Sequence, residues 1–389
     1  MKNNWKKCQL GDLITFQRGH DLPKTKMQGG TFPVVGSNGI IGYHNEYTTE
    51  APSITIGRSG NVGKPFLYKG RSWSHNTSLY IREYKDVDPI FIYYYLQTLD
   101  LGSYAGGSAV PTLNRNHIHT LSVTVPGDME EQRQIASMLS ILDDKIEINT
   151  KINENLAEQI QTLCNAWLND YVPFGGNCPD DWELTPLSSF ARFVSGYSYK
   201  GNELQPSSIA MATIKNFDRK GGFKLDGYKE IIPSSKLKPE HHASLFDTLV
   251  AHTDLTQNAE VIGNAEPVLS FSGYEDIIFS MDVVKVVPNN PAISKFLIAA
   301  MLQTQQFKGH CLGYVNGTTV LHLSKKALPE YSLMLPRDFS VLKPLDETVS
   351  SMYQQMALNI DECVQLASLR DSLLPRLMSG ELVVSALDL

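Results

Sequence analysis

The sequence is poor in cysteine and has no long apolar run, and these absences exclude several classes of protein. Its cysteines are odd in number, scattered and never paired as C-x-x-C: Cys8, Cys164, Cys178, Cys311 and Cys363. Neither a disulfide framework nor a zinc site is expected, and the pattern favours a reducing cytoplasm. No apolar run approaches the roughly 20 residues that cross a bilayer, and the N-terminus lacks a signal-peptide core, so we expect neither membrane insertion nor secretion.

Catalytic motifs are also lacking. The histidines include the adjacent pair His241 and His242 but no H-E-x-x-H motif. The stretch GRSGNVGK (57–64) has five residues rather than four before its final Gly-Lys, and Pro65 stands where a P-loop carries Ser or Thr. DPIF (88–91) lacks the second proline of the loop in which amino-methyltransferases hold a flipped base. We therefore expect no catalytic residue, no metal site and no cofactor bound by this chain.

Charge is distributed unevenly along the chain. The net charge is -7, yet residues 1–127 carry 13 Lys and Arg against 8 Asp and Glu. Residues 128–170 carry 3 against 9, and residues 337–389 carry 4 against 8. The acidity therefore lies mostly in helical segments, and the first globular segment is modestly basic, so the net charge does not exclude a polyanionic partner.

An internal repeat organises the chain. WKKCQLGDLITFQRG begins at Trp5, and WELTPLSSFARFVSG begins 177 positions later at Trp182. GSAVPTLNRNHIHTLSVTVP begins 210 positions before GTTVLHLSKKALPEYSLMLP, so the second half holds about 33 additional residues. The matched pairs are Trp5/Trp182, Leu10/Leu187, Leu13/Phe190, Phe16/Phe193, Gly19/Gly196, Gly107/Gly317, Val110/Val320, Leu113/Leu323, Arg115/Lys325 and Pro126/Pro336.

A long helical pattern follows each repeat. The segment from Glu130 to Leu163 has neither proline nor glycine and keeps apolar residues at helical spacing, and a second such segment is expected to end at Pro375. Each helix of roughly 40 residues would reach about 60 Å. We expect the two to pack antiparallel as a spacer through these side chains: Ile135, Leu139, Leu142, Ile146, Leu156, Leu163, Val349, Met352, Met356, Leu366 and Leu373.

Two points about these helices stay open at the level of sequence. The helices could instead be ordinary bundle helices inside a single core. Asn149 interrupts the apolar stripe, either as a polar contact that sets the register or as a surface residue.

Each repeat is expected to form an α+β globular domain. Short β-branched and aromatic runs alternate with Gly, Asn and Ser turns in residues 30–47 and 52–68. The corresponding pieces of the second half are residues 211–217, 247–265 and 282–288. Single helices are expected at 91–99 and at 294–307.

Polar loops on both globular domains are candidate nucleic-acid contacts. Arg and Lys bind phosphates and recognise guanine, whereas Asn and Gln form hydrogen bonds with adenine edges. Loop 57–64 is equally compatible with turn geometry alone. The candidates in the first half are Arg18, Lys24, Lys26, Asn38, Arg58, Ser59, Asn61, Lys64, His75, Asn76, Arg115 and Asn116. Those in the second half are Lys200, Lys215, Asn216, Arg219, Lys220, His252, Thr253, Asn258, Asn316, Thr318, Lys325 and Lys326. Their recurrence on two globes suggests a DNA reader with two half-sites.

Taken together, these motifs resemble the specificity subunit of bacterial type I restriction-modification systems. The resemblance rests on GSNGIIGYHNEY, IGRSGNVGK, GSAVPTLNR, EEQRQIASMLSILDDKIEINTKINENL, HTDLTQNAEVIG, GYVNGTTVLHLSKKALP and LRDSLLPRLMSGEL. It implies a non-catalytic subunit whose target-recognition domains, residues 1–127 and 173–336, read a split asymmetric DNA site, with spacer helices in 128–172 and 337–389.

The resemblance also implies partners. Two methyltransferase subunits would methylate adenine at N6 with S-adenosylmethionine, and two restriction subunits would translocate and cut DNA with ATP and magnesium. The main alternative is a protein-binding adaptor whose two globes hold peptides or partner domains. A stand-alone enzyme is a third possibility, which turnover by the isolated chain would revive.

Overall fold

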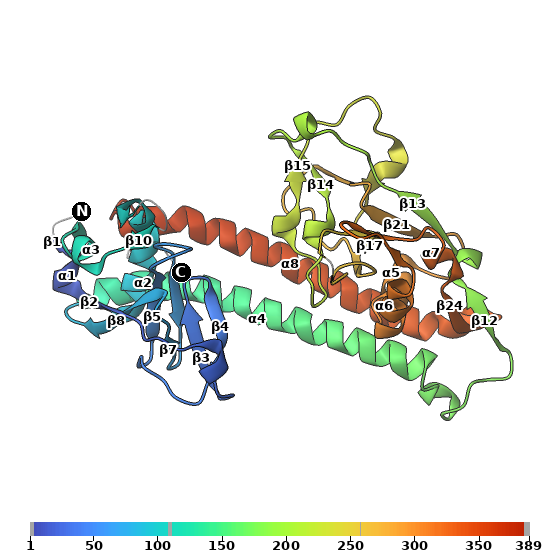
Figure 1. Ribbon diagram of the computed structural model, residues 1–389, viewed down its shortest axis with the longest axis horizontal. Coiled ribbons are helices and arrows are strands. Elements are labelled where there is room, and N and C mark those ends of the chain that lie inside the picture. The colour runs from blue at the N-terminus through green and yellow to red at the C-terminus, as the bar shows by residue number, and fades with distance from the viewer. Residues whose placement is uncertain (1–3, 108–110, 257, 385–389) are drawn as a thin grey trace. The chain divides into compact units, whose positions relative to one another are not determined.

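The computed structural model describes residues 4–107, 111–256 and 258–384. The chain divides into two compact units, one comprising residues 1–146 and 366–389 and the other residues 147–365. Each unit is mixed α+β (Figure 1). Two long helices, α4 (Met129–Leu168) and α8 (Lys343–Met378), each contribute residues to both units. This division differs from the four sequence segments, which treat the helices as separate spacers.

The first unit is built on a four-stranded sheet in the order β2-β8-β5-β6, with a smaller sheet β4-β3-β7 and the pairs β1-β11 and β9-β10. Its strands are β1 Trp5–Gln9, β2 Ile14–Arg18, β3 Phe32–Gly36, β4 Gly39–His44, β5 Ser53–Gly57, β6 Pro65–Tyr68, β7 Trp73–Ser74, β8 Ser78–Tyr84, β9 Ala105–Gly106, β10 Thr112–Leu113 and β11 Ser122–Pro126. Its short helices are α1 Leu10–Leu13, η1 Lys24–Lys26, α2 Pro89–Thr98, η2 Leu101–Tyr104 and α3 Arg115–His119.

The second unit repeats this plan with insertions. Its sheets have the orders β13-β21-β17-β19, β15-β14-β20-β16 and β18-β23-β22, with the pair β12-β24. Its strands are β12 Trp182–Pro186, β13 Ala191–Ser195, β14 Ile209–Ala212, β15 Lys229–Glu230, β16 His242–Ala243, β17 Thr248–Ala251, β18 Thr253–Asp254, β19 Ala265–Pro267, β20 Asp276–Phe279, β21 Val283–Pro288, β22 Val315–Asn316, β23 Leu321–Leu323 and β24 Ser332–Pro336. Its short helices are η3 Val172–Phe174, η4 Leu187–Ser189, η5 Gly201–Glu203, η6 Ile214–Asn216, η7 Leu225–Gly227, η8 Pro239–His241, α5 Lys295–Leu302, α6 Gln305–Leu312, α7 Ala327–Glu330 and η9 Phe339–Leu342.

The repeat seen in the sequence recurs as strand pairing. Trp5 lies opposite Pro126 in the pair β1-β11, and Trp182 lies opposite Pro336 in the pair β12-β24. The sheet β2-β8-β5-β6 corresponds strand for strand to the sheet β13-β21-β17-β19. Of the matched pairs, Val110 lies outside the described residues. The two units therefore share one topology.

Close backbone packing explains the glycine pair of the repeat. A Cβ on Gly19 would lie 2.1 Å from the carbonyl oxygen of His75, and a Cβ on Gly196 would lie 2.1 Å from that of Ser280. No side chain fits at such a distance, so the same crossing of two segments requires glycine in both units.

In the first unit the long helices pack into the core of the globular part. Ile135 and Leu139 of α4 share a buried cluster with Leu374 and Leu377 of α8. The expectation that Pro375 ends the second helix is wrong, because α8 continues through it to Met378. Proline removes one helical hydrogen bond, but burial of the neighbouring leucines at about 2 kcal/mol each offsets that loss.

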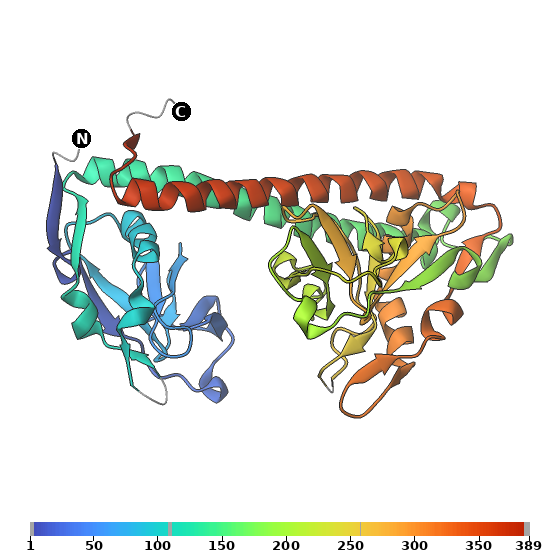
Figure 2. The same cartoon turned by 90° about the horizontal axis from the view of Figure 1, so that it is seen from above.

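In the second unit the helices meet through a polar seam. Asn149 is only 1% exposed, and its amide donates to Glu362 Oε2 at 2.6 Å. Asn359 Nδ2 donates to Asn153 Oδ1 at 2.8 Å, and Asn153 Nδ2 donates to the carbonyl of Met356 at 3.1 Å. Higher numbers on α4 meet lower numbers on α8, so the helices run antiparallel here, as Figure 2 shows. Asn149 is thus a buried interhelical contact and not a surface residue.

The side chains expected to pack between the helices are all buried or half-buried. Ile135, Leu139 and Val349 are buried, and the half-buried ones are Leu142, Ile146, Leu156, Leu163, Met352, Met356, Leu366 and Leu373. Ile152 and Leu369, which also belong to the apolar stripes, are 42% and 47% exposed and lie off the packed face.

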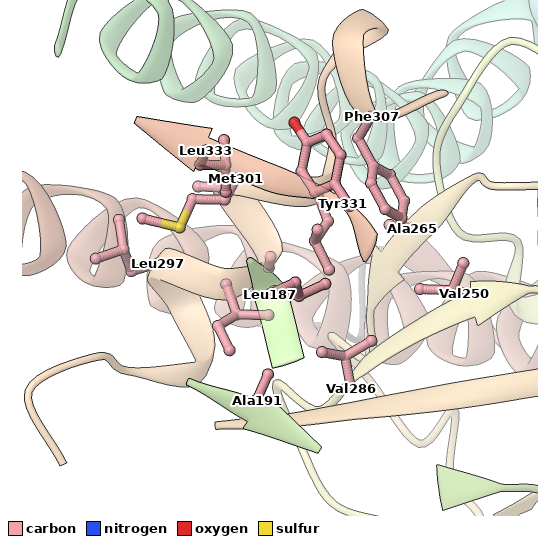
Figure 3. Close-up of a cluster of buried hydrophobic side chains, with 14 of the residues drawn as sticks. Leu187, Ala191, Val250, Ala265, Val286, Leu297, Met301, Phe307, Tyr331 and Leu333 are labelled. Atoms are coloured by element: carbon pink, nitrogen blue, oxygen red, sulfur yellow. The ribbon is translucent and has the colours of Figure 1, made fainter. Parts of the chain in front are cut away.

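The core of the second unit joins sheet, short helices and α8. Leu187, Val250, Val286 and Leu297 meet in one cluster (Figure 3). The expected single helix at 294–307 is wrong: α5 ends at Leu302, and Thr304 caps α6 by accepting a hydrogen bond from the Phe307 amide. The break lets Phe307 turn into the core, where it is fully buried.

The helix α2 corresponds to the helix predicted at 91–99, but it begins two residues earlier, at Pro89, and ends at Thr98. The Asp88 carboxylate accepts hydrogen bonds from the amides of Ile90 and Phe91, each at 2.9 Å, and Pro89 occupies the first turn. None of the helices described has the length and apolar character that a bilayer crossing requires.

Candidate nucleic-acid interface

A loop at the same place in each sheet provides the frame of the candidate site. In the first unit it follows β5, and the Leu113 amide donates to the carbonyl of Arg58 at 2.9 Å. In the second unit it follows β17, and the Leu323 amide donates to the carbonyl of His252 at 2.8 Å. Arg58 and His252 therefore occupy equivalent positions.

The first unit has a basic cleft at this place. Its volume is about 860 Å³, and its lining residues are Gln17, Arg18, Arg58, Leu79, Arg82, Gly106, Thr112, Leu113, Asn114, Arg115 and His117. Four of these are arginines and none is acidic. We call this feature the arginine cleft, defined by Arg18, Arg58, Arg82 and Arg115.

Separate elements bring the four arginines together. Arg18 is the last residue of β2, Arg58 begins the loop after β5, and Arg115 begins α3. Arg82 lies in β8 at a β-bulge: Phe16 pairs with Ile81 and Thr15 with Glu83, so Arg82 is the additional residue. A bulge redirects one side chain while it preserves the pairing on both sides, and here that side chain lines the cleft.

The arginine cleft is electrostatically unbalanced. None of its four arginines forms an ion pair with any described residue, and Arg82 makes only a 3.4 Å hydrogen bond to Gln17 Oε1. Partial burial, with the Arg18 charge as a smaller cause, lowers the pKa of Arg58. Guanidinium groups collected without a counter-charge are suited to bind an anion.

The sequence predicted three of these arginines and missed Arg82, as well as His117 and Gln17, which also line the cleft. Arg82 sits in a strand run whose alternation does not reveal the bulge. His117 was visible in the stretch NRNHIH, where it lies two residues after Arg115.

The other predicted residues of the first unit lie apart from the cleft lining. Ser59 forms an isolated bridge with Thr112, which itself lines the cleft. Asn76 donates to Asp21 Oδ1, His75 bonds Thr77 Oγ1 at 3.0 Å, and Lys64 lies 5.6 Å from the ring centroid of Phe66. The exposed remainder are Lys24, Lys26, Asn38, Asn61 and Asn116.

The equivalent place in the second unit carries different chemistry. Strand register puts Ser195 at the position of Arg18. Lys325 is the counterpart of Arg115, because each lies two residues after the leucine that bonds the loop, Leu323 or Leu113. The pairing of β13 with β21 has no bulge, so Arg82 has no counterpart. Burial, followed by the neighbouring His322 and Lys325 charges, lowers the pKa of His252, while Asp282 opposes this effect.

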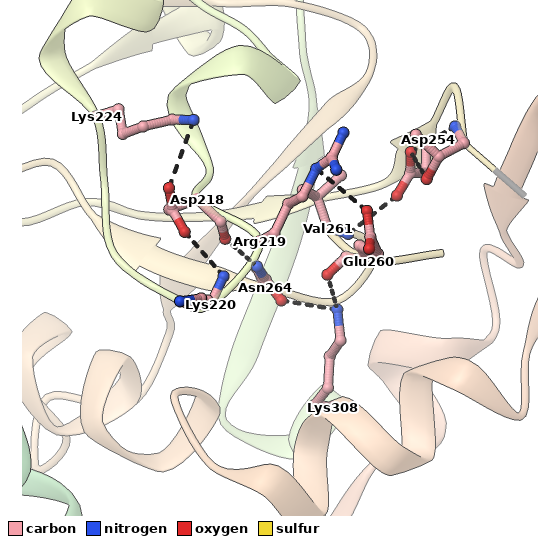
Figure 4. Close-up of polar contacts among 10 residues, drawn as sticks. Asp218, Arg219, Lys220, Lys224, Asp254, Glu260, Val261, Asn264 and Lys308 are labelled. Atoms are coloured by element: carbon pink, nitrogen blue, oxygen red, sulfur yellow. Dashed lines mark hydrogen bonds and ion pairs between the residues drawn. The ribbon is translucent and has the colours of Figure 1, made fainter. Parts of the chain in front are cut away.

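Two loops of the second unit are held together by a dense polar network (Figure 4). Arg219 pairs with Glu260 at 3.1 Å, and the Asn264 amide donates to the carbonyl of Asp218 at 2.8 Å. Lys308 Nζ donates to the carbonyls of Glu260 and Ile262 and to Asn264 Oδ1. The predicted cation Arg219 is therefore partly neutralised.

Asp254 fixes the start of the loop that follows β18. Its carboxylate accepts hydrogen bonds from the amides of Thr256 at 2.7 Å and Val261 at 3.0 Å. Burial alone would raise its pKa, but these bonds outweigh burial and leave the pKa below its ordinary value. Next to it lies a pocket of about 360 Å³ that Lys215, Arg219 and Leu255 help to line.

A buried carboxyl group connects these loops to α8. Glu266 accepts hydrogen bonds from the Gly222 amide at 2.7 Å and from Gln303 Nε2 at 2.6 Å, and the Tyr353 hydroxyl donates to Gln303 Oε1. Burial raises the pKa of Glu266 to about 7, and the two hydrogen bonds reduce that rise. The equivalent position in the first unit is Phe66, because Thr55 pairs with Phe66 as Leu249 pairs with Glu266.

Two predicted residues of the second unit are buried and have structural contacts. Asn216 is fully buried, accepts from the Thr213 amide and donates to the carbonyl of Lys224. Thr253 is 4% exposed and bonds His322 Nδ1 at 3.2 Å. Their polar loop context made them resemble exposed residues. Those that are exposed are Lys200, Lys215, Lys220, Asn258, Asn316, Thr318, Lys325 and Lys326.

Comparison with known proteins shows which proteins this chain is similar to. Residues 2–158 match the family described as the type I restriction modification DNA specificity domain. The chain is 21% identical over 412 residues to the type I restriction enzyme MjaVIII specificity subunit of Methanocaldococcus jannaschii, covering 99% of this chain and 94% of that one. It is 23% identical over 323 residues to the MjaIX specificity subunit of the same organism, covering 76% and 70%.

A solved structure shares the fold. The type I restriction-modification system S subunit from M. genitalium aligns over 96% of both chains with a TM-score of 0.61 and 17% identity. In sequence the chain is thus similar to type I restriction-modification specificity subunits, as the sequence resemblance predicted. Both of these relatives are named specificity subunits.

Proposed function

We propose that the chain is the non-catalytic DNA-recognition subunit of a type I restriction-modification complex and reads a split, asymmetric DNA site. The observation that carries this proposal is the duplication. Two units share one strand order, and each carries a different side chain at the same loop position. A shared frame with different side chains is suited to read two different half-sites.

The two long helices are proposed to set the gap between the half-sites. In each unit they make antiparallel contacts, through Asn149 and Glu362 in one and Asp143 and Arg370 in the other. The recognition domains would then be residues 1–127 and 173–336, and the spacer segments 128–172 and 337–389. This layout supports a ruler function because helix length is set by residue number.

The complex is proposed to contain two methyltransferase and two restriction subunits in addition to DNA. S-adenosylmethionine, ATP and magnesium would be bound by those partners. The chain described here would contribute DNA recognition and surfaces for assembly.

A domain exchange tests the function. Replacing the first globular segment with that of a related specificity subunit should change one half of the recognised site and leave the other half unchanged. Mapping methylated adenines across the genome of a host carrying each version reads out the result. A change in both halves contradicts modular reading, and the absence of any DNA-dependent change favours the protein-binding adaptor.

Lengthening the helices tests the ruler. A seven-residue insertion in each helix, outside the buried contacts, should alter the tolerated gap and preserve both half-sites. An unchanged gap in the methylation map would contradict the spacer assignment.

A further inference from the structure

The arginine cleft holds more positive charge than the recognition of a base requires. A single arginine reads a guanine through two hydrogen bonds, and the base itself carries no charge. Here four guanidinium groups line one cleft without any acidic residue among its lining. Their mutual repulsion is relieved by a ligand that brings negative charge, and in DNA that ligand is the phosphodiester group.

The size and construction of the cleft fit a segment of nucleic-acid backbone better than a free ion. At about 860 Å³ it is much larger than one small anion. The arginines come from a strand end, a loop, a bulge and a short helix, so four separate elements contribute to the lining. His117 and Gln17 add hydrogen-bonding groups to the same lining.

The second unit lacks such a concentration at the equivalent place. Ser195 and His252 stand where Arg18 and Arg58 stand, Arg82 has no counterpart, and only Lys325 retains a permanent charge. Its nearby Arg219 is paired with Glu260. The ionic contribution to DNA binding is therefore unequal between the units.

We propose that the arginine cleft clamps a phosphodiester of the DNA backbone and makes the first unit the salt-sensitive anchor of the chain. This inference rests on the proposed function, because it requires a DNA duplex as the ligand. It assigns Arg82 to the clamp together with Arg18, Arg58 and Arg115. The clamp contributes affinity for any sequence, and base reading falls to other side chains.

The experiment measures binding of the full chain, in complex with its methyltransferase subunits, to random-sequence duplexes and to a duplex carrying its site. Fluorescence anisotropy is recorded from about 50 to about 200 mM salt, a range in which phosphate contacts weaken strongly. The variants are Arg58→Gln and Arg82→Gln. Arg133→Gln, which removes an exposed arginine of α4, is the charge-matched control, and His252→Gln is the positional control in the second unit.

For each cleft variant we expect the slope of log affinity against log salt to become shallower by about 1 and binding to weaken about tenfold for both duplexes. Both controls should leave the slope unchanged. Thermal unfolding identifies variants that fail to fold, and Arg58→Lys, which keeps the charge, should recover most of the slope.

The outcomes separate the two hypotheses. If the unmodified complex binds neither duplex, the proposed function fails. If it binds and both cleft variants keep the original slope, the clamp is overturned while the function stands. If they weaken only the duplex carrying the site, with the slope preserved, the arginines read bases and the clamp is also overturned.

Discussion

The loops after β5 and β17 occupy the same place in two sheets of identical strand order, yet one begins with Arg58 and the other with His252. The first belongs to a cleft whose charge is permanent, and the second to a site whose histidine charge depends on pH. The backbone contacts that hold the loops are shared, whereas the side chains at their tips differ. In this fold the shared framework therefore tolerates different side chains at the candidate interface.

The shared framework can be broken at its glycines. Gly19→Ala and Gly196→Ala each place a Cβ about 2 Å from a carbonyl oxygen, so each should lower the free energy of unfolding by about 3 kcal/mol. Hydrogen exchange should show the loss in β2 and β8 for the first variant and in β13 and β21 for the second. Gly29→Ala and Gly201→Ala, where nothing lies within 4 Å of the new Cβ, are the controls. Equal protection in variant and control would contradict the close-packing argument.

A second difference between the units is the buried Glu266, which replaces Phe66. Its pKa is raised to about 7 by burial, above the ordinary value of 4.5, so the folded state binds the proton more tightly than the unfolded state. Stability of the second unit is then greatest below about pH 4.5 and falls as pH rises to about 7, by up to about 3 kcal/mol.

Glu266→Gln should remove this pH dependence in chemical denaturation monitored at several pH values. Phe66→Leu in the first unit is the positional control and should not change the slope. The difference in free energy of unfolding between the wild type and Glu266→Gln should therefore change with pH. A difference that stays constant would contradict the ionisation argument.

Transferring one arginine sharpens the comparison of charge. Ser195→Arg places a guanidinium where the first unit has Arg18, so DNA affinity at low salt should rise several-fold and the salt slope should steepen by up to about 1. Ser188→Arg, at another exposed position of the second unit, should have a smaller effect. Equal effects from both would show that position does not matter.

The smallest expected effect concerns His252. Because burial lowers its pKa below the ordinary value of about 6.5, it is neutral at pH 7.5 and gains charge on acidification. Acidification from about pH 7.5 to about 5.5 should tighten DNA binding, and His252→Gln should reduce that gain about two-fold. Anisotropy titrations at both pH values measure it. An identical gain in the variant would assign the pH response to other groups, among them the neighbouring His322.

Much of the framework was predictable because it depends on local pattern and repetition. Trp5 and Trp182, Gly19 and Gly196, and the periodicity of residues 130–163 led to the duplicated plan and to α4. The division of 294–307 into α5 and α6 was not predictable, since it depends on how Thr304 and Phe307 meet the core. The passage of α8 through Pro375 likewise depends on packing partners distant in sequence.

The site was less predictable than the frame. Residue type identified Arg18, Arg58 and Arg115, but only tertiary structure shows that they share a cleft. Arg82 depends on a bulge that alternation conceals, and the burial of Asn216 depends on contacts with Thr213 and Lys224. Side-chain placement, unlike the repeat, has no signature in a single sequence.

The bulge at Arg82 has an evolutionary consequence. Since Phe16 keeps Ile81 and Thr15 keeps Glu83 as partners, the strand holds one inserted residue without displacing its neighbours. A one-codon insertion between Val286 and Val287 would therefore let β21 present a new side chain to the same location while the rest of the sheet stays in place. If the proposed function holds, small insertions give such a chain a route to new target preferences without any substitution in the residues that hold the fold together.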